Sequence, residues 1–193
     1  LFADGWGAGW YEGCMNELAN AAKSKGNWAI AHELGHVNQI SPGLKWVSTT
    51  EVTNNVYSVC VRYQFGRDSM PLEQEKCNDG NNNNVLGGRF NSYLNYGIIK
   101  GEQWLCQKGQ DNMDPSKYPY GGDHFVKLCP LWQLLLYYRE IVGGEKRDWY
   151  GDVAEIVRNT DESQLTNGQL QLNFMRNTMD VVKEDLTDFF IKA

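Results

Sequence analysis

Apolar residues recur every three or four positions along much of the chain, which is the spacing of helices that bury one face. The pattern predicts helical segments over residues 16–25, 27–40, 48–63, 130–142, 149–158 and 175–190, and a short amphipathic element over 90–99. In the segment 27–40, Trp28, Ala31 and Leu34 should face the core. Residues 170–174 alternate over a span too short to separate a strand from a helix. The predicted fold class is mainly α, or α+β at most.

Proline and glycine mark the ends of these helices. Ser-Pro-Gly at 41–43 should end the helix before it. Pro130 suits the first turn of the next long helix, and Gly143 with Gly144 should end it. Residues 66–88 are polar and contain four consecutive asparagines, so they should form a long connection, either a functional flap or an insertion.

The first thirteen residues are rich in glycine and aromatic side chains, which favours an irregular loop over a helix. In this loop, Trp6, Trp10 and Tyr11 could form the apolar wall of a substrate-binding groove. Equally, the segment could be the end of a strand that packs on the core. The pattern does not choose between these interpretations.

Composition restricts the function further. The chain has 193 residues, enough for a single domain over residues 1–193. Its net charge of −6 and pI of about 5.1 give no basis for nucleic-acid binding. No apolar run approaches the roughly 20 residues that a membrane span requires. The five cysteines contain no Cys-x-x-Cys pair, which disfavours a structural zinc knuckle.

The strongest chemical signal is the sequence His32-Glu33-Leu34-Gly35-His36. Residues four apart lie one turn apart on the same face of a helix, so His32 and His36 can offer their imidazole nitrogens to one point. Glu33 lies beside them and can act as a general base without binding the metal. This is the H-E-x-x-H motif of zinc peptidases. Gly35 could allow a neighbouring element to approach the helix closely.

A catalytic zinc site needs a third protein ligand, and Glu51 is the first acidic residue after the helix breaker. Ser48-x-x-Glu51 is also a capping-box pattern, in which the carboxylate would bond only to the backbone of Ser48. A helical hairpin would return Glu51 towards His36, which favours the ligand interpretation. A glutamate in place of a third histidine is typical of the gluzincins and argues against the metzincins.

Further side chains could support this centre. Asn55 lies one turn after Glu51, and its amide could accept a hydrogen bond from a ligating histidine; Asn54 is the neighbouring candidate. Both could equally be ordinary helix-surface amides. His124 could stabilise the oxyanion, or could simply begin a helix without a catalytic role. Four tyrosines compete for the oxyanion role, and spacing does not separate them: Tyr93, Tyr96, Tyr118 and Tyr120.

The residues around these motifs resemble the M60-like, enhancin-type family of zinc metallopeptidases. The similarity is most specific at residues 31–39, AHELGHVNQ, and 51–55, EVTNN. Residues 130–134, PLWQL, and 185–190, DLTDFF, are similar to downstream helices of that family. The resemblance covers most of residues 27–193. It implies a helical gluzincin-type domain, in which the HExxH helix is followed by a helix that bears the glutamate.

This resemblance also implies a function. The family's residues carry over as one Zn²⁺ per chain, held by His32, His36 and Glu51, with Glu33 as general base for attack by a metal-bound water. The implied substrates are O-glycosylated, mucin-type proteins, cleaved by a secreted, periplasmic or cell-surface enzyme. Family catalytic domains also have an N-terminal β portion. Little of it can be present here, so the chain is expected to be part of a longer protein.

Two other functions remain open. A gluzincin without a glycan requirement, such as an aminopeptidase, would carry an acidic anchor for the substrate amine before HExxH, often in a G-x-M-E-N-like segment. No such segment occurs here. A binding module for glycans or host surfaces with a vestigial zinc site would have a damaged motif, but His32, Glu33 and His36 are all intact.

Overall fold

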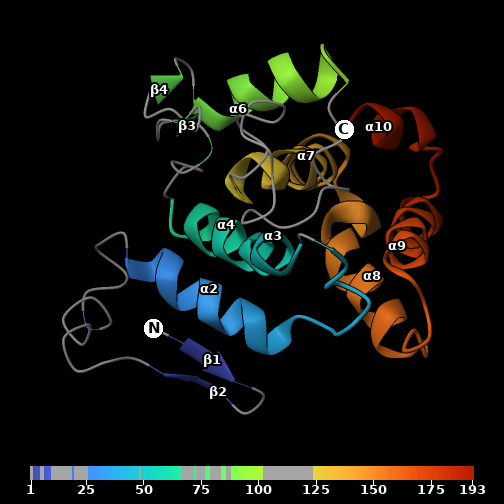
Figure 1. Ribbon diagram of the computed structural model, residues 1–193, viewed down its shortest axis with the longest axis horizontal. Coiled ribbons are helices and arrows are strands. Elements are labelled where there is room, and N and C mark those ends of the chain that lie inside the picture. Colours follow the sequence, from blue (N-terminus) through green and yellow to red (C-terminus); the bar gives the residue numbers. More distant parts are fainter. Residues whose placement is uncertain are drawn as a thin grey trace.

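The structure, a computed structural model, is mainly helical, as the sequence predicts (Figure 1). It describes residues 2–4, 7–9, 19, 26–47, 49–66, 72, 77–78, 84–85, 88–101 and 124–193. Almost all of the helix predicted over 16–25 lies outside these residues. Trp6, Trp10 and Tyr11 also lie outside them, so their proposed place in a substrate groove stays a prediction.

A helical hairpin forms the N-terminal half of the described structure. Helix α2 (Gly26–Asn38) packs along α4 (Asn55–Gln64), and the short α3 (Thr50–Thr53) precedes α4 with a turn at Asn54. On its other side, α2 contacts the antiparallel strands β1 (Phe2–Asp4) and β2 (Gly7–Gly9), so α2 lies between a small β ribbon and the other helices (Figure 1).

Helix α7 (His124–Leu136) lies across α3 and α4 and begins six residues before the predicted start. The prediction that Pro130 opens this helix is wrong, because Pro130 lies in its interior. An interior proline costs roughly 3 kcal/mol. Here the flanking turns bury apolar side chains, including Val126, Leu128 and Leu131, and this packing stabilises the helix across the proline.

A second short group of elements lies beside α7. It contains α6 (Gly88–Ser92), which continues as a π-helix, η2 (Tyr93–Ile98), and both contact α7. The two-residue strands β3 (Cys77–Asn78) and β4 (Asn84–Val85) pair antiparallel next to α6. The short amphipathic element predicted over residues 90–99 is therefore helical and belongs to a longer helical stretch.

The C-terminal part is a set of helices on one side of the hairpin (Figure 1). After α7 the chain forms η5 (Tyr137–Val142) and the 3₁₀-helix η6 (Gly144–Asp148). Helix α8 (Trp149–Arg158) has the predicted bounds and packs on α9 (Asn167–Val182), which is followed by α10 (Thr187–Lys192). Residues 170–174, ambiguous in the sequence, are helical.

Local sequence explains the helix boundaries in this part. Gly143 and Gly144 have φ of +67° and +63°, a backbone conformation that side chains disfavour, so the predicted stop after η5 is confirmed. Helix α9 begins with a capping box between Thr166 and Gln169. It ends at Lys183, which adopts the left-handed conformation.

A single connected core joins the hairpin to the C-terminal helices. The buried cluster includes Val52, Val56 and Val59 of α3 and α4, Leu128, Leu131 and Leu135 of α7, and Trp149, Val153 and Phe174 of the C-terminal helices. Leu34, predicted to be buried, is 45% exposed, because α2 turns its other side to α4. Among the described helices, none combines the length and apolar character that a membrane crossing needs.

Candidate metal centre

Three side chains from two helices converge at the hairpin. His32 and His36 project from the same face of α2, and their rings are 4.7 Å apart between centroids. Glu51 lies in the first turn of α3, and its carboxylate reaches back to both rings. The ligand atoms of these three residues all lie within 4.8 Å of one another. They form the His32–His36–Glu51 cluster.

The spacing of the cluster suits a small tetrahedral metal ion. His32 Nε2 and His36 Nε2 each lie 3.3 Å from Glu51 Oε2. Zinc binds nitrogen and oxygen ligands at about 2.0–2.2 Å in tetrahedral geometry, which separates ligand atoms by roughly 3.3–3.6 Å. Two imidazoles and one carboxylate are also ligand types that zinc accepts. The three residues therefore fit the group that the sequence predicts.

Electrostatics within the cluster favours opposite charges. Burial acts to lower the pKa of His32, but hydrogen bonds with Glu51 and Asn55 and the negative charge of Glu51 outweigh it, so this pKa is raised. The hydrogen bond with His32 lowers the pKa of Glu51, although burial opposes this change, and the charges of His36, His32 and His124 lower it further.

Gly35 determines how closely the two helices approach at the cluster. A Cβ atom at this position would lie 2.4 Å from the backbone O of Asn54 and 3.0 Å from its carbonyl carbon. Both atoms belong to the main chain, so neither can rotate away. The sequence prediction of a close approach at Gly35 is confirmed, and the neighbouring element is the turn between α3 and α4.

The two asparagines lie against the histidine rings. Asn55 Nδ2 donates to the Glu51 carbonyl at 2.8 Å, which directs its Oδ1 towards His32 Nδ1 at 3.0 Å. Asn54 is fully buried, and its Nδ2 lies 3.1 Å from His36 Nε2. Neither is a helix-surface amide. Their role in supporting the ligands stays a prediction, although both are in contact with the rings.

The predicted catalytic side chains lie near the same cluster. Glu33 is buried next to His32 on α2, and its negative charge acts on the His32 ring. His124 is the first residue of α7, and its charge contributes to the lowered pKa of Glu51, whose main cause is the hydrogen bond with His32. The charge of His124 thus acts on the cluster from a position 73 residues after Glu51.

The competing tyrosines do not gather there. Tyr93 is buried, and its hydroxyl donates to Gln133 Oε1 at 3.3 Å, on another part of α7. Tyr96 is described only in its backbone, within η2. Tyr118 and Tyr120 lie outside the described residues. Among the candidates that the structure describes, His124 is the one whose charge acts on Glu51.

The fold and this geometry agree with a known family. Residues 6–193 match the model of peptidase M60, enhancin and enhancin-like. The chain belongs to the peptidase M60 family. This match extends the resemblance seen at the motifs to nearly the whole sequence. A comparison with curated proteins gives no match.

Two solved structures resemble this M60 chain, each with 24% sequence identity and a TM-score of 0.59. One is a functionally unknown conserved protein from Bacillus anthracis str. Ames; the match covers 92% of this chain and 29% of that chain. The other is a metallopeptidase in complex with Tn antigen, with 91% and 28% covered. At this identity the likeness shows the fold, and this chain spans less than a third of either.

Sequence reasoning missed one side chain beside the His32–His36–Glu51 cluster. Gln39 follows the last residue of α2, and its Oε1 lies 3.4 Å from His36 Nδ1. Its buried amide nitrogen faces the first turn of α3. The signal that could have found it is its position three residues after His36, where a side chain still lies near the same helix face.

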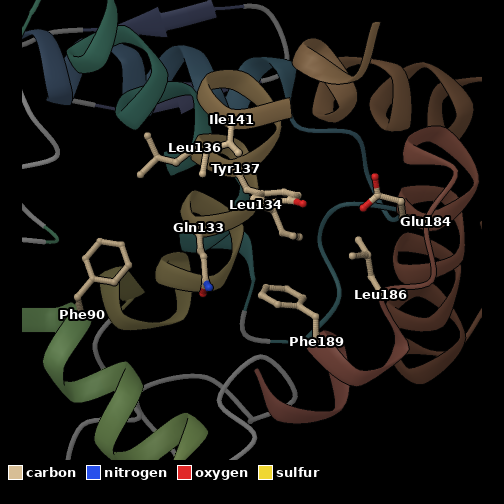
Figure 2. Close-up of a pocket in the computed structure, with 9 residues that line it drawn as sticks. All are labelled: Phe90, Gln133, Leu134, Leu136, Tyr137, Ile141, Glu184, Leu186 and Phe189. Carbon is tan, nitrogen blue, oxygen red and sulfur yellow. The ribbon is translucent and has the colours of Figure 1, made fainter. Parts of the chain in front are cut away.

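A separate cavity of about 490 Å³ lies where α7 and η5 meet α6 and α10 (Figure 2). Its lining is mostly apolar, with Gln133 and Glu184 as polar exceptions. Gln133 is nine residues along α7 from His124, or about 14 Å at the helical rise. The cavity therefore belongs to a different region from the His32–His36–Glu51 cluster.

Proposed function

We propose that this chain carries the catalytic centre of a zinc-dependent endopeptidase that acts on O-glycosylated, mucin-type proteins. The observation that supports it most directly is the convergence of His32, His36 and Glu51 at distances suited to tetrahedral zinc. These three residues would hold one Zn²⁺ per chain. Three protein ligands leave a fourth position open, which is typical of catalytic rather than structural zinc sites.

The chain's own residues supply the rest of the proposed chemistry. A bound zinc ion would act as a Lewis acid and lower the pKa of a water towards neutrality. Glu33, one residue after His32 and buried beside it, is the proposed general base, which accepts a proton and returns it to the leaving amine. His124 is the proposed donor to the oxyanion, since its charge already acts on Glu51.

The amides are proposed to hold the ligands in place. Asn55 would keep its Oδ1 against His32 Nδ1, so that Nε2 of the same ring faces the metal. Asn54, buried against both rings, would restrict their movement. The aromatic residues Trp6, Trp10 and Tyr11 remain proposed substrate contacts on the basis of sequence alone.

The substrate class is proposed from family membership and from a relative. The M60 resemblance implies mucin-type substrates, and one metallopeptidase with this fold is in complex with the glycan Tn antigen. Substrates of this class occur outside cells, so the proposed location of the enzyme is secreted, periplasmic or attached to the cell surface. Glycan binding without hydrolysis is the competing function, and only an assay of cleavage separates the two.

The proposal is tested by incubating the protein with a mucin-type glycopeptide and, separately, with the same peptide without sugar. Mass spectrometry then measures the cleavage of each peptide. We expect cleavage of the glycosylated form alone. Glu33→Gln should abolish cleavage while zinc content stays near one per chain, and Glu145→Gln, at an exposed glutamate of η6, should leave it unchanged. Equal cleavage of both peptides would retain the peptidase and remove the glycan requirement. Zinc binding without cleavage of either peptide would favour the binding module.

A further inference from the structure

We propose that Gln39 is a positioning residue of the metal centre: it orients the His36 ring and ties it to the helix that carries Glu51. The inference rests on the proposed function, because it assigns a role towards the metal ligands. Gln39 is only 5% exposed, although glutamine is usually a surface residue. Its position, one residue beyond the end of α2, places it between the two ligand-bearing helices.

The surroundings of Gln39 determine which way its amide points. Its Nε2 lies 3.0 Å from the Thr50 carbonyl, 3.4 Å from the Thr49 carbonyl and 3.5 Å from the Leu44 carbonyl. It also donates to Thr53 Oγ1. Backbone carbonyls only accept hydrogen bonds, so the amide nitrogen and not the oxygen must face them. The Oε1 atom of Gln39 is therefore directed to the opposite side.

On that side, Oε1 faces His36 Nδ1 at 3.4 Å. An amide oxygen only accepts, so it selects a ring in which Nδ1 carries the hydrogen. The other ring nitrogen, Nε2, then faces Glu51 Oε2 at 3.3 Å, in the place where a metal would be bound. His32 has a matching arrangement with Asn55, so each histidine is oriented by its own amide.

The same side chain also fixes the position of Glu51. The carbonyls of Thr49 and Thr50 belong to the start of α3, directly before Glu51. Thr53 Oγ1 accepts from Gln39 and donates to the Leu44 carbonyl at 2.6 Å. Through Gln39, a ligand on α2 and a ligand on α3 are thus held by one buried hydrogen-bond network, which cooperative bonding stabilises.

This network continues into the C-terminal helices. Tyr150 of α8 is buried, and its hydroxyl donates to the Thr53 carbonyl at 3.2 Å. The threonine that receives the Gln39 amide is therefore also held by a helix almost 100 residues later in the chain. Gln39 lies against a rigid support, as a positioning residue requires.

Gln39→Met tests the proposal, because methionine matches the size of glutamine without its amide. The first readout is the exchange of the ring Nδ1–H protons with water, measured by NMR on metal-free protein. The chain has three histidines, so the signals are simple to assign. We expect the His36 signal to be protected in the wild type and lost in Gln39→Met, with His32 unchanged. Asn55→Ala should give the opposite result.

Zinc affinity is the second readout, measured by competition with a chromophoric chelator. Loss of a side chain that orients a ligand typically reduces metal affinity by about 10–100-fold. Gln133→Met is the matched control: it makes the same substitution at a glutamine of α7 whose described hydrogen bond is with Tyr93, and it should keep the His36 signal and the zinc affinity.

An unprotected His36 signal in the wild type would overturn the proposal without any variant. So would a signal that survives in Gln39→Met, or an equal loss of affinity in Gln133→Met, which would show that the loss is not specific to Gln39. Because the NMR readout needs no metal, a wild type that fails to bind zinc would refute the proposed function and still leave the Gln39–His36 bond tested.

Discussion

Replacing Gly35 with alanine should disturb the candidate metal centre through the backbone alone. A Cβ at this position would lie 2.4 Å from the Asn54 carbonyl oxygen, whereas ordinary van der Waals contact begins at 3.4 Å. Helix α2 and the α3–α4 turn must therefore separate by about 1 Å. Glu51 lies one turn before Asn54, so the same shift moves its carboxylate relative to His32 and His36.

The size of the effect follows from two opposing contributions. Alanine in place of glycine inside a helix gains about 1 kcal/mol. Overpacking a tight contact typically costs about 1–3 kcal/mol, and here the cost should be high because only main-chain atoms are available to move. We expect a net destabilisation of about 1–2 kcal/mol, equivalent to a fall of roughly 2–8 °C in Tm for a chain of this size. Zinc affinity should fall by about 10-fold or more.

Gly151→Ala provides the matched control. Gly151 lies within α8, is exposed, and a Cβ there would meet no atom within 4 Å. Only the helix-propensity gain applies, so this variant should raise the free energy of unfolding by up to about 1 kcal/mol and leave zinc affinity unchanged. Urea unfolding of metal-free protein and a zinc competition assay measure both quantities. If Gly35→Ala is as stable as Gly151→Ala and binds zinc equally well, the close approach at Gly35 does not position the ligands.

Three further predictions concern other parts of the structure. Burial raises the pKa of the Cys60 thiol from 9.0 to about 11, so its alkylation at pH 8 should be about 100-fold slower than in the urea-unfolded chain. Peptide mass spectrometry measures both alkylation rates, and equal rates would contradict this prediction. Because the pKa of His32 is raised above its ordinary value of 6.5, protonated His32 stabilises the fold below pH 6.5, and this stability is lost as pH rises through the folded-state pKa. Because the pKa of Glu51 is lowered from its ordinary value of 4.5, ionised Glu51 stabilises the fold above pH 4.5, and this stability is lost as pH falls through the folded-state pKa. Glu51→Gln should therefore destabilise metal-free protein most between pH 4.5 and 6.5. If the variant has the same loss of unfolding free energy relative to the wild type at pH 9, this prediction is refuted. Tyr150→Phe leaves the buried Thr53 carbonyl without its donor and should cost about 1–2 kcal/mol in urea unfolding; no loss would mean that the bond contributes little.

The ligand residues could be predicted from sequence because their geometry is local. The i, i+4 spacing of His32 and His36 fixes both rings on one helix face without any tertiary information. The helix breaker at residues 41–43 predicted that the next helix returns antiparallel as a hairpin. Such a hairpin places Glu51 near His32 and His36. Helix α8 could also be predicted from the sequence, since two glycines precede it and its apolar residues have regular helical spacing.

Other features depend on partners that a local pattern does not contain. Leu34 has the right spacing for the core, but α4 packs on a different side of α2 and leaves it exposed. Gln39 finds its partners in Leu44 and residues 49–53, which fold back around its amide. The start of α7 was missed because Pro130 suggested a first turn, whereas tertiary packing outweighed the local cost of proline. The bond between Tyr150 and Thr53 spans 97 positions, beyond any periodicity.

The hairpin that holds His32, His36 and Glu51 spans only 20 residues from first ligand to last. Closing so short a segment loses little chain entropy, and its contacts are of low order, which favours early formation during folding. Beyond α4, each doubling of a connecting loop adds only about 0.6 kcal/mol of closure cost. Insertions between α4 and α6 should therefore cost little folding free energy and leave the ligand set unchanged. Length variation should concentrate there, and the hairpin should keep a constant length.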